Sequence, residues 1–129
     1  LGGFYATYFV AKYACPAVLI NPAMQPWQLF QTLFGIDQIP LKITESWTLN
    51  AEHLQQLQSI AEVELKNADK ILVLLQQGDE VLDYHQAQRY YSAAQPSSLI
   101  FTDTGGSHAM DDFEERLALV LEFLSAAIQ

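Results

Sequence analysis

The chain has 129 residues, a length typical of one domain, so we predict a single domain over residues 1–129. Half of the residues are hydrophobic and 16% are charged, which excludes a disordered chain. The formal net charge of −9 repels phosphate and anionic lipid, so neither nucleic acid nor a membrane is expected as a partner. No apolar run reaches the roughly 18 residues of a membrane span. The single cysteine, Cys15, cannot form an internal disulfide, which fits a cytoplasmic protein.

The first half of the chain combines helical patterns with one strand. Residues 4–14 are apolar on most faces and lack Gly and Pro, which predicts a buried helix that ends before Pro16. The short apolar run Ala17–Ile20 predicts a buried parallel strand. A helix with an aromatic face is expected over Pro26–Phe34, ended by Gly35.

The middle of the chain begins with a segment of no clear period. Residues 36–48 are interpreted as an irregular excursion that has room for a short strand. Asn50 is a good N-cap for a helix over residues 51–65, whose apolar residues recur at helical spacing. The run ILVLLQ that follows Lys70 predicts a second buried strand over residues 71–76.

The last third repeats the alternation of helix and strand. A helix is expected over residues 84–94 with Asp83 as its N-cap, and a strand over residues 98–102. Residues 111–128 predict a long amphipathic helix with acidic residues in its first turn. Alternating strands and helices imply an α/β fold with a parallel sheet covered on both faces. Three strands make a narrow sheet, so the architecture looks incomplete.

Two loops at the carboxyl ends of the predicted strands hold residues that could carry chemistry. Asp79 follows the second strand after a glycine, and His108 follows the third strand after Gly105 and Gly106. An aspartate on one imidazole nitrogen leaves the other free to take a proton from a nucleophile, as in acyl-transfer triads. The order Asp then His is that of the α/β-hydrolase fold, in which a serine in a G-x-S-x-G turn comes first. The start Leu1-Gly2-Gly3 matches the part of that turn directly after the serine.

Four segments resemble the small bacterial YqiA-like esterases of the α/β-hydrolase superfamily: LGGFYAT, VLINPAMQP, LLQQGDEVLDYHQAQRYY and GGSHAMDDFEE. The resemblance extends over the chain and implies the C-terminal two-thirds of that fold, a partial domain without its first strands. It implies Asp79 as triad acid, His108 as base and the N–H of Leu1 as an oxyanion donor. It also implies a small acyl ester or thioester substrate and no cofactor. The serine would precede Leu1, so this chain alone is expected to be inactive.

Other roles remain open for several of these residues. Asp79 could be an ordinary turn residue and His108 a structural loop residue. Asp103 is a rival acid, although it would more naturally bind the backbone of its own loop. His53 and His85 are expected at the surface, Cys15 as a small buried side chain, and no metal site is predicted.

A second hypothesis is a non-catalytic α/β interaction module. The aromatic residues between 27 and 47 could form a lid over an acyl pocket or simply pack in the core. Without further strands, the strand over residues 17–20 would have an unpaired edge. That edge predicts pairing with a second copy or with the segment that precedes Leu1.

Overall fold

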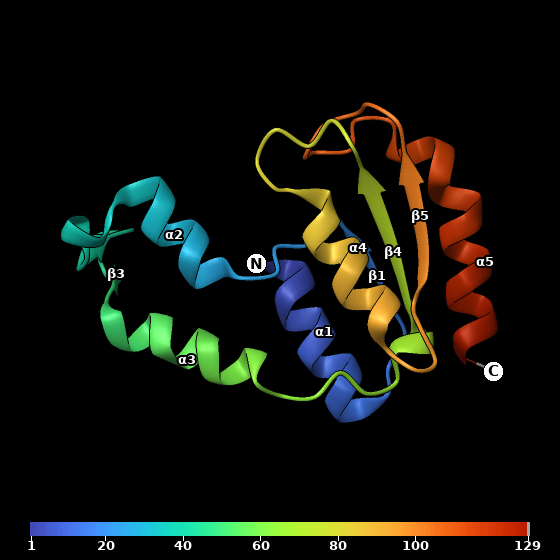
Figure 1. Cartoon of the computed structure of the whole chain (residues 1–129), viewed down its shortest axis with the longest axis horizontal. Helices are drawn as coiled ribbons and strands as arrows, with labels where there is room; N and C mark the ends of the chain where they lie inside the picture. The colour runs from blue at the N-terminus through green and yellow to red at the C-terminus, as the bar shows by residue number, and fades with distance from the viewer. Residues whose placement is uncertain (129) are drawn as a thin grey trace. The chain divides into compact units, whose positions relative to one another are not determined.

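The computed structural model contains a parallel sheet of three strands (Figure 1). The strands are β1 (Ala17–Ile20), β4 (Ile71–Gln76) and β5 (Leu99–Asp103). Their order is β1-β4-β5, so β4 is the middle strand, and both pairings are parallel. The α/β class and the parallel pairing that the sequence predicts are therefore confirmed, with the third strand shifted by one residue.

The structure describes residues 1–128, except for the side chain of Ile36. They form two compact units. The first consists of Leu1–Met24 and the chain from Leu65 onward, and it contains the parallel sheet. The second unit is Gln25–Glu64.

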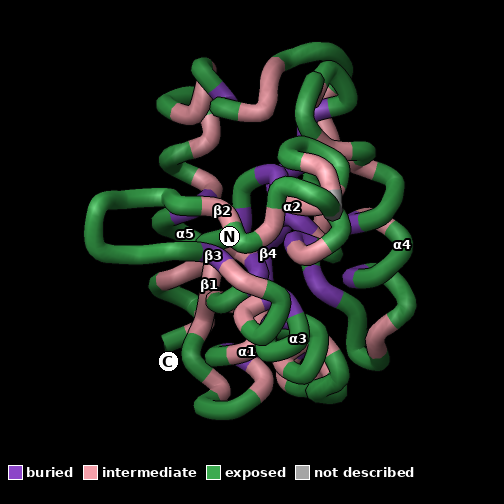
Figure 2. Tube along the Cα trace, turned by 90° about the vertical axis from the view of Figure 1, so that its left-hand side faces the viewer, coloured by how far each residue is buried: buried purple, intermediate pink, exposed green. Residues whose placement is uncertain are grey.

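Three α-helices flank the sheet in the first unit: α1 (Gly2–Tyr13), α4 (Tyr84–Ala93) and α5 (Leu117–Ile128). Val10 of α1 and Tyr91 of α4 belong to the apolar cluster on one face of the sheet. Val120 of α5 packs with Leu74 in the cluster on the other face. Successive β4 side chains point to opposite faces, so all six are buried between the two layers (Figure 2).

The last helix begins later than the sequence predicts. A helix was expected from residue 111, but a 3₁₀ turn, η3 (Phe113–Arg116), comes first and α5 begins at Leu117. The carboxylate of Asp111 accepts a hydrogen bond from the hydroxyl of Ser107, and that of Asp112 accepts one from the side-chain amide of Gln76 at the end of β4. The two carboxylates therefore hold the loop before η3 in place and do not cap a helix.

The second unit contains the segment that the sequence left irregular. Its elements are α2 (Pro26–Phe34), the 3₁₀ turn η1 (Ile36–Gln38), β2 (Leu41–Lys42), β3 (Thr48–Leu49) and α3 (Ala51–Ala61). The strands β2 and β3 pair in antiparallel fashion. Asn50 caps α3 as predicted by accepting the N–H of His53 at 3.1 Å. His53 completes a capping box through Nδ1, so the interpretation of His53 as a plain surface residue was incomplete.

Cys15 is exposed, which contradicts the prediction of a buried side chain. The reason is local. Ala14 ends α1 in the left-handed conformation, with φ of 54°, and turns the chain away from the helix. Cys15 therefore lies in the short connection to β1, outside the apolar layer.

Tyr91 connects α4 to the first turns of α1. Its side chain is buried, and its hydroxyl is 2.6 Å from the hydroxyl of Thr7, which donates to the carbonyl of Gly3 at 2.8 Å. Burial raises the pKa of the Tyr91 phenol, because the charged phenolate would lose its hydration.

Replacement Tyr91→Phe should lower the free energy of unfolding by about 1 kcal/mol near neutral pH. The raised pKa of Tyr91 means that the unfolded chain releases this proton first, at a pH of about 10. The wild-type protein should therefore lose stability as the pH rises above that value, and Tyr91→Phe should lose less. Urea unfolding at neutral and alkaline pH tests this. Equal alkaline losses in both proteins would contradict it.

Candidate active site

The structure brings Asp79 and His108 together at the carboxyl ends of neighbouring strands. Asp79 Oδ2 is 2.9 Å from His108 Nδ1. The other carboxylate oxygen accepts the N–H groups of Val81 at 2.8 Å and Leu82 at 2.9 Å. The Asp79 side chain is only 2% exposed. Both oxygens of this carboxylate are thus held by defined partners.

The histidine is more accessible than its partner. The His108 side chain is 40% exposed, against 2% for Asp79. Its main-chain N–H donates to the carboxylate of Glu80 at 3.0 Å. A buried acid thus orients an imidazole that another molecule can reach, which is the geometry of a general base held by a carboxylate.

Glycine is required where the two loops cross. The N–H of Gly78 donates to the carbonyl of Gly105 at 2.7 Å. A Cβ at position 78 would lie 2.8 Å from the carbonyl carbon of Gly105 and closer still to the oxygen of Gly106. This close approach of two backbones lets Asp79, one residue later, reach the loop that carries His108.

Two buried amides that the sequence analysis did not single out hold the loop of residues 105–112, here called the histidine loop. Asn21 directly follows β1 and is 4% exposed, and Gln76 is the last residue of β4 and is 1% exposed. Asn21 donates to the carbonyls of Ser107 at 3.1 Å and His108 at 3.0 Å. The sequence signal that could have identified these amides is a polar residue at the carboxyl end of an apolar strand, since a buried polar side chain needs partners.

Gln76 holds the same loop from the middle strand. Its side-chain oxygen accepts the N–H of Ser107 at 2.8 Å, and its amide nitrogen donates to Asp112 at 2.7 Å. Gly106 adopts φ of 78°, and a Cβ there would overlap the Gln76 amide. The second glycine of the pair is therefore needed for both conformation and space.

The start of α1 packs against the segment that follows β1. Leu1 is the N-cap of α1. A Cβ on Gly3 would lie 2.8 Å from the Cβ of Pro22, so the first turn of α1 packs directly on the residue after Asn21. Because Asn21 binds the carbonyl of His108, the segment that contacts the first turn of α1 also holds the loop of His108.

The rival acid has a different partner. Asp103 accepts from Arg116 Nε at 3.0 Å and lies 2.7 Å from a second guanidinium nitrogen, and this contact raises the pKa of Arg116. Asp103 thus binds neither His108 nor, through its side chain, the backbone of its loop. This result corrects the prediction for that residue.

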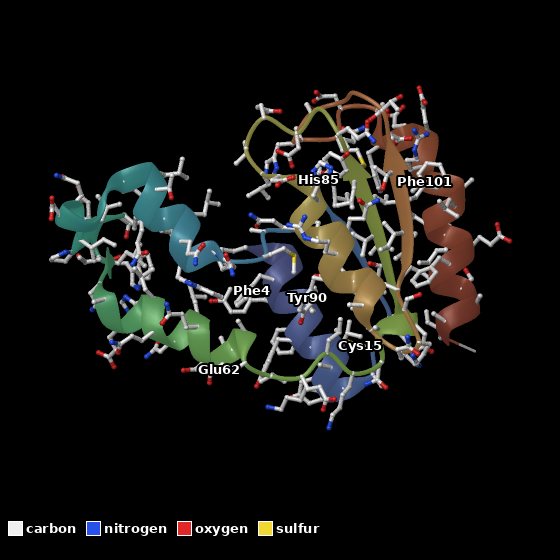
Figure 3. All side chains as sticks on the ribbon, in the orientation of Figure 1. Phe4, Cys15, Glu62, His85, Tyr90 and Phe101 are labelled. Carbon is white, nitrogen blue, oxygen red and sulfur yellow. The ribbon has the colours of Figure 1, made fainter. Side chains whose placement is uncertain are left out.

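The remaining candidates lie outside the Asp79–His108 contact. His85 is exposed as expected and lies 2.7 Å from Asp83, whose pKa the hydrogen bond lowers. Cys15 lies toward the amino ends of the strands, away from His85 (Figure 3). Among the described residues, no group of three or more His, Cys, Asp and Glu side chains could hold a metal ion. None of the helices described is long and apolar enough to cross a membrane.

A model of an uncharacterised protein family (UPF0227) matches residues 1–125. The matched range includes the start of α1, Asp79 and His108, and it ends within α5.

The crossing of the two loops can be tested with glycine substitutions. Gly78→Ala should reduce the free energy of unfolding by about 2 to 3 kcal/mol, because the new methyl group meets backbone atoms. Gly105→Ala is the matched control, since it adds only the strain of φ near 79° and meets no atom within 4 Å. Its expected cost is about 1 kcal/mol. Chemical denaturation measures both, and equal costs would contradict the close backbone contact.

Proposed function

The chain belongs to the UPF0227 family, that of the YqiA-like esterases, and we propose that its full-length protein hydrolyses small acyl esters or thioesters with a Ser-His-Asp triad. The single observation that supports this mechanism best is the contact of 2.9 Å between Asp79 and His108. Family membership supports a hydrolase in general. The triad, its residues and the substrate class are our proposal.

Asp79 serves as the orienting acid in the proposed mechanism. In this role its Oδ2 accepts a hydrogen bond from the Nδ1–H group of His108. Nε2 of the imidazole is then free to accept a proton. Asp79 also stabilises the imidazolium that forms when His108 takes that proton. The N–H groups of Val81 and Leu82 keep the carboxylate from rotating away.

The nucleophile in this proposal is a serine directly before Leu1. The contact between the first turn of α1 and Pro22 supports this position of the serine. Pro22 follows Asn21, and the Asn21 side chain binds the histidine loop. The N–H of Leu1 would then be one donor to the oxyanion, and the amino end of α1 would favour negative charge there.

The reaction proceeds by acyl transfer in two steps. The serine oxygen attacks the substrate carbonyl while His108 takes its proton, and His108 returns that proton to the leaving alcohol or thiol. Water then attacks the acyl-enzyme with His108 again as base. This chemistry requires no metal or organic cofactor.

The proposal also includes the partners and the location of the protein. Among the described residues, β1 pairs on one side only, with β4, so its other edge is available to a preceding strand or a second copy. We retain the expectations of a cytoplasmic location and of no nucleic-acid partner. The role of the aromatic residues between 27 and 47 as a lid stays a prediction.

The triad is tested by kinetics on the full-length protein with a short-chain nitrophenyl ester. Asp79→Asn should lower kcat by about 10⁴-fold, because the histidine loses its orienting acid. His108→Ala should be at least as severe. Asp83→Asn is the matched control, since this exposed aspartate contacts His85 instead and should leave kcat unchanged.

A fluorophosphonate probe gives an independent test of the nucleophile. One adduct should form on the serine directly before Leu1, and His108→Ala should abolish its rapid formation. An adduct elsewhere would contradict the proposed nucleophile. Absence of both labelling and ester hydrolysis would favour the non-catalytic interaction module.

A further inference from the structure

The Asn21 side chain joins the ends of β1 and β4 to the histidine loop. Its Oδ1 accepts the main-chain N–H of Gln76 at 3.0 Å. Its Nδ2 donates to the carbonyls of Ser107 at 3.1 Å and His108 at 3.0 Å. Its own main-chain N–H donates to Leu74 at 3.0 Å, which fixes the residue to the middle strand.

We propose that Asn21 is a positioning residue for the base, because it holds the main chain of His108 where the ring meets Asp79. This inference rests on the proposed function of that pair. The ring of His108 can only be as well placed as its backbone, and the preceding residues Gly105 and Gly106 permit many conformations. Both amide protons of Asn21 are directed at carbonyls of this loop, directly after the glycine pair.

The chemistry of the position favours an amide. Two carbonyl oxygens require donors and the N–H of Gln76 requires an acceptor, and a buried side chain must satisfy all three. Asparagine offers both kinds of group, whereas an aspartate of the same shape offers acceptors only. Asn21 also has φ of 41°, a left-handed conformation that Asn and Asp tolerate better than most residues.

A second contact holds the other polar atom of the His108 main chain. The N–H donates to Glu80, but that residue is exposed, so water can replace its carboxylate. Asn21 is buried at 4% exposure, so water cannot easily replace its amide. Loss of the Asn21 amide should therefore displace the main chain of His108 more than loss of the Glu80 carboxylate.

The test is Asn21→Asp in the full-length protein, which keeps the shape, the backbone preference and the acceptor for Gln76 but removes both donors. We expect kcat for the short-chain ester to fall by about 100-fold, the scale of a displaced catalytic group. KM should stay within about threefold, because the acyl site is not touched. The rate of fluorophosphonate labelling should fall in parallel with kcat.

The matched control is Asn67→Asp. Asn67 also has a positive φ, 57°, and donates to two carbonyls, those of Val10 at 3.2 Å and Ala11 at 3.5 Å. It precedes the 3₁₀ turn η2 (Ala68–Lys70) at the amino end of β4, opposite to the site. This variant should lose stability without a change in kcat.

The outcomes separate the inference from the function beneath it. If Asn21→Asp keeps its kcat while Asp79→Asn loses it, the triad stands and the positioning role of Asn21 is wrong. If Asp79→Asn and His108→Ala both keep full activity, the proposed function is wrong and the inference falls with it. Should Asn21→Asp fail to fold, Asn21→Gly keeps the left-handed backbone without adding charge, and the same loss of kcat is expected.

Discussion

The burial of β4 is the constraint on which the candidate site depends. All six of its residues are buried, and the strand is hydrogen-bonded on both sides. The last residue of this otherwise apolar strand is Gln76, whose side chain and main-chain N–H are both buried away from water. Buried polar groups need partners within the protein. Asn21, Ser107 and Asp112 supply them, and in doing so they fix the loop that carries His108.

A difference in exposure between two residues in contact gives the site its chemical character. Asp79 is enclosed and anchored by two main-chain N–H groups, whereas His108 is accessible. The enclosed carboxylate can orient the imidazole with little competition from water, and the exposed ring is accessible to another molecule. Both residues follow the ends of adjacent strands, the edge at which open parallel sheets bind ligands.

The sequence predicted the strands, the α/β class and the proximity of Asp79 to His108. It failed at interactions between distant segments. Asn21 and Gln76 are 55 residues apart, and no local pattern pairs the side chain of Asn21 with the main-chain N–H of Gln76. The acidic residues 111 and 112 fitted the first turn of a helix, yet Asp111 accepts from the hydroxyl of Ser107 and Asp112 accepts from the side chain of Gln76. Cys15 was expected to be buried because cysteine is a small apolar side chain, but it lies in a connection that leaves it exposed.

The sequence alone determined the alternation of helices with the three strands of the parallel sheet, because burial of one face or both imposes a period on apolar residues within a few positions of each other. The tertiary structure decided which polar side chains meet. Gln76 pairs with Asp103 in the sheet, so Asp103 is still within β5, where it binds Arg116. The loops beyond that pair bring Asp79 to His108. Strand register sets these partners, and register depends on packing between segments far apart in the chain.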